Sequence, residues 1–477
     1  MITLTNDLCM THILNRRRTM QGKKFFSALA TLVVIGAMIL GACAPATAPQ
    51  TVVQTVVVPG TPERIVVTAT AAAPEVEPVT VMANWGGDEE AGFREVLDAF
   101  TAQTGIPYVY EGTRNLGVLV RSRIAGGNPP DVAMIPRPGE VAEFARQGAI
   151  VPLDGVRGDE ILPPDLLAEN YSQAWIDLGT VDGYFFGLTV KANSKSTFWY
   201  KPASFEALGV EPPGTWADLT AIADAYLANG QTPYAIGGLD GWTLTDWFEN
   251  IYVRVAGPEM YLKLFVTHEV EWTDPSVVEA MERLREIVDP ATKLAGGVEG
   301  SLSTGFIDAF NIVLRADPGA EMYYEGGFMS SFAEQNFPDL VGGEDYAFFP
   351  FPEINPEWGK PVVGGGDLAV VFRDRPEVRE FIRFLAGAEA NTIWATAEKG
   401  AVVSPNKNVS LDVYPPLKGL EAAQLTQAER FVFDGSDLAP SAVGGDAMFT
   451  GLQDFVENPG DIDRILAFLE EVADRSY

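Results

Sequence analysis

Short apolar segments alternate with amphipathic segments from residue 79 to residue 148, and this alternation is the strongest constraint on the fold. The apolar runs predict strands, and apolar residues that recur every three or four positions predict helices. The expected strands are 79–84, 106–110 and 131–135, and the expected helices are the segment that ends at Gly105, 116–124 and 138–147. This strand-helix order indicates a largely parallel sheet with helices on its faces, an α/β fold.

The same helical periodicity returns later in the chain. Four further amphipathic stripes begin at Trp216, Val277, Val378 and Ile462. Apolar stripes of this kind are typical of core packing rather than of ligand surfaces. The α/β pattern therefore continues to the C-terminus.

The N-terminus has the features of an export signal. Five basic residues precede the apolar run 25–42, which is the order of a signal peptide. The run ends Leu-Gly-Ala-Cys43, which resembles a bacterial lipobox, where the cysteine is lipidated and becomes the mature N-terminus. The alternative is an uncleaved anchor, for which about 18 residues is near the lower limit. Both interpretations place the body of the protein outside the cytoplasm, and the signal could start at Met1 or Met20.

Residues 44–78 are almost entirely Ala, Pro, Thr and Val. A segment with so little chemical variety cannot specify a core, and its prolines favour an extended chain. We therefore expect a signal peptide over 1–43 and a tether over 44–78, followed by the folded body.

Histidine and cysteine are scarce, which excludes several kinds of chemistry. Only His268 and Cys43 would accompany the exported chain, because His12 and Cys9 precede the lipobox. A zinc cluster or an internal disulfide therefore cannot form, and no cofactor is expected. The net charge of -32 argues against nucleic acid as a partner. Chemistry based on carboxylates stays open.

Six motifs then occur in an order that indicates one family. They are GGNPPDV at 126–132, FWYK at 198–201 with PPGTW at 212–216, MYYEGGF at 322–328, FPFP at 349–352, the glycines at 364–366, and the helix at 376–386. Together they resemble the extracellular solute-binding proteins of carbohydrate ABC importers, the maltose-binding-protein-like family. The stretch GWTLTDW at 241–247 resembles a motif of its α-glucoside-binding branch.

The resemblance implies a two-lobed periplasmic-binding-protein type II fold with a hinge and a ligand cleft between the lobes. The chain would cross near 190–193, 363–366 and 410. The implied lobes are 79–190 plus 364–410, and 191–363 plus 411–477. Such a protein, expected to be a monomer, would capture a sugar (an oligosaccharide or α-glucoside) by hinge closure and deliver it to the permease subunits of an ABC importer. No catalysis is implied.

A sugar packs its C–H faces on aromatic rings and pairs its hydroxyls with two-ended polar groups. Loops that follow the expected strands are where α/β sheets bind ligands. After the first strand, Trp85 is a candidate for stacking and Glu89 for hydroxyl binding, although acids also favour a helix N-terminus. Arg114 and Arg137 follow the second and third strands, and each could instead be a solvated loop arginine.

Further candidates lie in the α-glucoside-branch motif. Trp242 and Asp246 are four residues apart, so a helix that begins here places both on one face. Trp247 would then point into the core. Three other tryptophans, Trp199, Trp216 and Trp394, are assigned mainly to packing.

The final candidates surround glycines. Tyr324, Glu325 and Phe328 flank the pair at 326–327, where glycine permits close backbone approach or a positive φ. Asp367 follows the run at 364–366, which we interpret as a hinge; Asp367 could serve the hinge or the ligand.

Two alternative functions stay open at this point. A lipid-anchored glycoside hydrolase would need two opposed carboxylates, such as Glu89 with Glu325 or Asp246. A binder of another solute, such as a polyamine or metal chelate, is compatible with the acidity but not favoured by the tryptophans.

Overall fold

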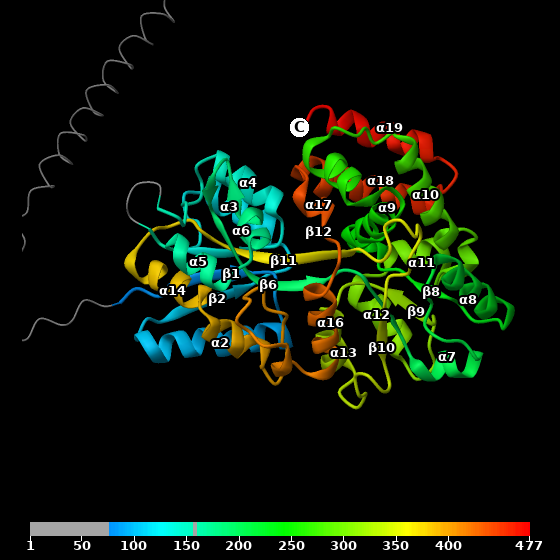
Figure 1. Ribbon diagram of the computed structural model, residues 1–477, viewed down its shortest axis with the longest axis horizontal. Helices are drawn as coiled ribbons and strands as arrows, with labels where there is room; N and C mark the ends of the chain where they lie inside the picture. The colour runs from blue at the N-terminus through cyan, green and yellow to red at the C-terminus, as the bar shows by residue number, and fades with distance from the viewer. Residues whose placement is uncertain (1–75, 156–159) are drawn as a thin grey trace, which may run out of the picture. The chain divides into compact units, whose positions relative to one another are not determined.

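The structure is a computed structural model that describes residues 76–155 and 160–477. The export signal, the lipobox cysteine Cys43 and nearly all of the tether lie outside the described residues. Residues Val76–Tyr477 form one structural unit, drawn in colour in Figure 1. Within the described residues, no helix combines the length and the apolar character needed to span a membrane.

The predicted strand-helix alternation is present at the start of this unit. The three strands are parallel and ordered β2-β1-β3. They are β1 (Val79–Ala83), β2 (Tyr108–Gly112) and β3 (Val132–Ile135), and the helices that follow them are α2 (Asp88–Thr104), α3 (Leu116–Ala125) and α4 (Pro138–Arg146). Each helix ends within a residue of its expected end because the apolar periodicity stops there. Buried side chains of α2, among them Phe93, Leu97 and Phe100, pack in the core on this sheet.

Two long strands add to this sheet at one end and continue beyond it at the other. β6 (Gly187–Ser194) and β11 (Val362–Val371) pair antiparallel along their length, with a register shift between Asp367 and Leu368. The C-terminal half of β11 pairs with β3, whereas its N-terminal half pairs with β12 (Phe431–Phe433). Figure 1 shows β6 and β11 side by side, running from the β1–β3 region into the second half of the unit. We call the part around β1–β3 the first lobe.

The second lobe surrounds a four-stranded sheet in the order β10-β7-β9-β8. Its strands are β7 (Thr197–Tyr200), β8 (Tyr234–Ala235), β9 (Met322–Tyr324) and β10 (Ala347–Pro350). The main helices of this lobe are α8 (Trp216–Ala228), α9 (Trp242–Leu262), α10 (Pro275–Val288), α18 (Met448–Glu457) and α19 (Ile462–Ala473). Their apolar stripes form one large core that includes Trp247 and Trp272.

The remaining elements complete the two lobes. Those of the first lobe are α5 (Pro164–Asn170), α6 (Gln173–Leu178), β4 (Thr180–Val181), β5 (Tyr184–Phe185), α14 (Pro376–Ala386) and α15 (Ala388–Ala395). Those of the second are α7 (Pro202–Leu208), α11 (Gly297–Ser303), α12 (Phe306–Leu314), α13 (Met329–Asn336), α16 (Pro416–Thr426) and α17 (Gly435–Leu438).

The two glycine motifs serve close packing. Within β11, a Cβ on Gly366 would lie 2.6 Å from the carbonyl oxygen of Lys191, and one on Gly364 would overlap the ring of Phe431. A Cβ on Gly327 would overlap the carboxylate of Glu421. None of these glycines has a positive φ. Close approach, rather than left-handed backbone, therefore explains them.

Candidate functional site

A cavity of about 290 Å³ lies between the two lobes. The ends of the first-lobe strands, the start of α9, and the two strands that run between the lobes, β6 and β11 (the crossing strands), meet there. Seven of the ten ligand-binding candidates line it: Trp85, Glu89, Arg114, Arg137, Trp242, Phe328 and Asp367. They come from both lobes and from β11, so the cavity exists only because the crossing strands bring the lobes together. Lys191, Asn193 and Lys195 line it as well and were not anticipated.

Trp85 is the aromatic wall contributed by the first lobe. It follows β1 directly, and its ring makes edge contacts with Phe93 and Trp394 at centroid distances of 4.8 and 4.7 Å. Its indole Nε1 donates to Asp367 Oδ2 over 3.3 Å. These contacts fix the orientation of the ring, and Trp394 has the packing role expected for it.

Lys191, on the crossing strand β6, forms ion pairs with both carboxylates of this wall. Its ammonium pairs with the carboxylate of Glu89 and lies 3.4 Å from Asp367 Oδ2. It also lies over the Trp85 ring, 5.7 Å from the centroid. Burial opposes the charge, but Glu89 and Asp367 outweigh it and raise the pKa of Lys191 above its ordinary value. Burial raises the pKa of Asp367.

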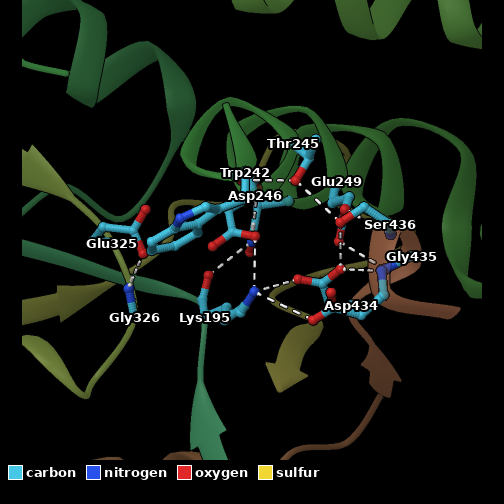
Figure 2. A network of polar contacts seen from close by, with 12 residues as sticks. Lys195, Trp242, Thr245, Asp246, Glu249, Glu325, Gly326, Asp434, Gly435 and Ser436 are labelled. Atoms are coloured by element: carbon cyan, nitrogen blue, oxygen red, sulfur yellow. Dashed lines mark hydrogen bonds and ion pairs between the residues drawn. The ribbon is translucent and has the colours of Figure 1, made fainter. Parts of the chain in front are cut away.

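Trp242 is the aromatic wall contributed by the second lobe. It is the first residue of α9 and packs edge-on against Phe306, with centroids 5.1 Å apart. Lys195 Nζ lies over this ring, 5.5 Å from its centroid. The same ammonium pairs with Asp434 and with Asp246 Oδ1, the latter at 3.1 Å (Figure 2). Asp437 Oδ2 lies 3.8 Å from the same ammonium. The second wall thus resembles the first, with a tryptophan, a lysine and carboxylates paired with that lysine.

Several carboxylates are buried behind this second wall. Asp246, Glu249 and Asp434 are fully buried, and their oxygens approach within 4.8 Å of one another. Burial raises the pKa of Asp246 and of Glu249. Burial also opposes ionisation of Asp434, but its ion pair with Lys195 prevails and holds its pKa below the ordinary value. Lys195 therefore already supplies positive charge where these acids could otherwise hold a metal ion.

Three sequence candidates do not line the cavity: Asp246, Tyr324 and Glu325. Asp246 shares a helical face with Trp242, but only the first turn of α9 reaches the cavity, so Asp246 meets Lys195 inside the protein. Tyr324 Oη lies within hydrogen-bonding distance of the carbonyl oxygens of Lys195 and Asp246, at 2.7 and 2.9 Å. Glu325 is fully buried and accepts a hydrogen bond from its neighbour's amide. All three side chains are therefore buried behind the second wall and do not face the cavity.

The two arginines reach from the first lobe to the second. Arg137 Nη2 donates to the carbonyl oxygen of Ser436 over 3.1 Å, and Arg137 Nε lies 3.5 Å from Asp437 Oδ1. The guanidinium of Arg114 lies 5.7 and 5.6 Å from the ring centroids of Phe306 and Phe332. Both arginines therefore stabilise an arrangement in which the lobes enclose the cavity.

Two lobes that enclose a polar and aromatic cavity beneath paired crossing strands define a protein that binds a solute between its lobes. Residues 86–392 match the family described as "Bacterial extracellular solute-binding protein". The chain belongs to this family. The resemblance inferred from the motifs and the two-lobed fold inferred from it are both confirmed.

Two relatives are similar over most of their length. The osmoprotective compounds-binding protein GgtB of Synechocystis sp. is 36% identical over 383 residues, which cover 79% of this chain and 88% of the relative. The alpha-glucosides-binding periplasmic protein AglE of Rhizobium meliloti is 35% identical over 401 residues, 81% of this chain and 84% of the relative.

Solved structures agree with the fold. The solute receptor AcbH, described as preferring β-D-galactopyranose, superposes with a TM-score of 0.73 at 21% identity, over 83% of this chain and 98% of that one. RafE in complex with raffinose superposes with a TM-score of 0.67 at 17% identity, over 83% and 99%.

Proposed function

We propose that the protein is the extracytoplasmic sugar-binding component of an ABC importer, and that it captures a neutral α-glucoside of about two sugar rings between its lobes. The observation that carries this proposal is the pair of tryptophans, Trp85 and Trp242, one from each lobe, on the wall of one cavity. The names of the two relatives, which refer to osmoprotective compounds and to α-glucosides, agree with it.

Charge pairing supports a neutral ligand. Lys191 pairs with Glu89 and Asp367. Lys195 pairs with Asp434, Asp246 and Asp437. Groups paired in this way still offer donors and acceptors to hydroxyls, but they leave neither lysine free to attract an anion.

Cavity size supports a short ligand. A volume of about 290 Å³ lies at the lower end of the range of small-molecule sites, about 300–1,000 Å³. Lys191 in β6 and Lys195, one residue beyond its end, lie over the two tryptophans. Four residues of extended chain would separate their Cα atoms by about 13 Å. Two linked rings could contact both aromatic walls, whereas a long oligosaccharide would not fit within the closed lobes.

We extend the proposal to the membrane anchor, the lobes and the oligomeric state. Lipidation of Cys43 would hold the protein at the membrane, and residues 44–78 would act as the tether. The lobes would be 79–190 plus 364–410 and 191–363 plus 411–477, moving about the crossing segments. The protein would act as a monomer that presents its closed form to the permease.

The test is thermal unfolding and calorimetric titration of the purified full chain with trehalose, sucrose, maltose, glucose and raffinose. A ligand at about 100 times its Kd should add about 2.7 kcal/mol to the free energy of unfolding. We expect stabilisation by an α-linked disaccharide, less by raffinose, and no product after prolonged incubation. Product formation would establish the hydrolase instead. Absence of any sugar response would reject the proposal in favour of another solute, such as a polyamine.

A further inference from the structure

A second cleft, separate from the sugar cavity, lies on the second lobe at the start of β11. It has a volume of about 480 Å³ and is bounded by the last regular turns of α9, the strand β10, the loop 358–361 and the helix α16. Arg254 lines it, and we call it the Arg254 cleft. None of its lining residues lines the cavity between the lobes.

Arg254 is a buried cation without a counter-ion. Arg254 is 1% exposed, and no carboxylate of a described residue lies within ion-pairing distance of it. Its guanidinium nitrogens donate to backbone oxygens, including that of Pro361 at 2.6 Å, and the group lies over the ring of Phe351. Arg254 Nε has no hydrogen-bond partner among the described residues. A buried positive charge balanced only by dipoles and a ring is costly unless an anion approaches it.

The rim of the cleft adds positive charge. Lys360 and Arg430 are exposed, and neither forms an ion pair with a described residue. Glu429 is the single carboxylate-bearing residue of the lining. With three cationic side chains and one carboxylate, the cleft is locally positive, whereas the net charge of the chain is -32. The local field therefore favours an anion although the protein as a whole repels one.

The rest of the wall is apolar apart from two glutamines, and its aromatic part is held in place by the main chain. α9 is kinked at Gly257, and the ring of Trp358 occupies the space that a Cβ on Gly257 would need. Trp358 Nε1 donates over 3.2 Å to the carbonyl oxygen of Val255, in the turn before the kink. Leu420, which is 58% exposed, lies on the α16 side of the cleft. The cleft thus combines a fixed aromatic wall with cations.

We propose that the Arg254 cleft is a second binding site, for a small organic anion that has an aromatic or apolar body. The carboxylate of the ligand lies toward Arg254 and the cationic rim, and its body packs between Trp358 and Leu420. The main chain at Pro361, which Arg254 binds, leads directly into the crossing strand β11. A ligand in this cleft therefore contacts the start of β11, one of the two strands that join the lobes.

The test is a ligand-observed NMR titration of the full chain with benzoate, using benzamide as the neutral analogue of the same shape. We expect saturable benzoate binding and at least tenfold weaker binding of benzamide. Leu420→Glu should weaken benzoate at least tenfold, because it places a carboxylate at the rim, whereas Leu420→Gln should weaken it much less. Leu420 is exposed, so both variants should fold.

A double variant removes the rim charges without touching the buried arginine. Lys360→Gln with Arg430→Gln should weaken benzoate at least tenfold. The matched control is Arg464→Gln with Arg475→Gln, which removes two exposed cations near the C-terminus and should leave binding unchanged. Equal binding of benzamide and benzoate, no benzoate binding, or equal losses in both double variants would overturn the proposal. Unchanged thermal midpoints check that the variants are folded.

Discussion

Lys191 and Lys195 lie four residues apart on the first crossing segment, and each ammonium group lies over the ring of a tryptophan from a different lobe. Lys191 faces Trp85 of the first lobe at 5.7 Å, and Lys195 faces Trp242 of the second at 5.5 Å. Lys191 also pairs with two carboxylates and Lys195 with three. The crossing segment therefore fixes two similar aromatic walls on one cavity, and the proposed sugar site depends on both.

The first prediction concerns the aromatic wall of the second lobe. Trp242→Ala should weaken sugar binding by about 2 kcal/mol, roughly 30-fold in Kd, because a central aromatic contact is lost. Trp242→Phe keeps a stacking ring and should lose much less. Calorimetric titration of the disaccharide identified in the panel measures both. A Kd for Trp242→Ala within about threefold of the wild-type value would remove Trp242 from the binding site.

The second prediction concerns the buried ion pairs behind that wall. Lys195→Met leaves Asp246 and Asp434 buried without their cation, which should reduce the free energy of unfolding by about 3–5 kcal/mol. Adding Asp434→Asn removes one of the stranded charges and should recover part of the loss. Urea unfolding measures the changes. No recovery in the double variant would mean that Lys195 stabilises the protein by packing rather than by its charge.

The elements of the fold could be predicted because their signals are local. The stripe of Phe93, Leu97 and Phe100 defines α2, and Gly105 ends it with a left-handed backbone, φ 73°. The lobe arrangement came from the order of motifs, not from periodicity. Strand pairing such as β11 with β6 joins residues far apart in the chain, and no local pattern reveals it.

The site was only partly predictable for the same reason. Trp85 and Trp242 are found from their position after a strand and at the start of a helix. Lys191 was missed, because its partner Glu89 is 102 residues away and only the pairing of β6 brings the two together. Strand periodicity gives no signal for Lys195, because β6 ends at Ser194. The aromatic neighbours of Glu325 indicate a ligand role, but its side chain is fully buried and does not line the cavity.

The third prediction tests the proposed anchor. Cys43→Ser should abolish the incorporation of labelled fatty acid into the protein, because the thiol that would carry the lipid is gone. Cys9→Ser is the matched control and should keep the label. Metabolic labelling with a fatty acid followed by immunoprecipitation measures both. Absence of label in the wild-type protein would favour the uncleaved anchor.

The last prediction follows from the burial of Glu325. Burial raises the pKa of Glu325 to about 8, so the folded protein keeps this carboxyl protonated at neutral pH. The unfolded carboxyl, with an ordinary pKa of 4.5, is ionised above that value. Between these two values the folded state binds more protons than the unfolded state, so this group makes the free energy of unfolding fall as the pH rises.

Glu325→Gln removes that titration while keeping the shape of the side chain. Urea unfolding at pH 5.5 and 8.5 should therefore show a smaller loss of stability with pH in Glu325→Gln than in the wild type. The exposed Glu269→Gln serves as the control and should keep the wild-type pH dependence. Equal pH dependence in Glu325→Gln and the wild type would show that Glu325 is ionised in the folded protein, with Lys195 as the nearby cation that balances it.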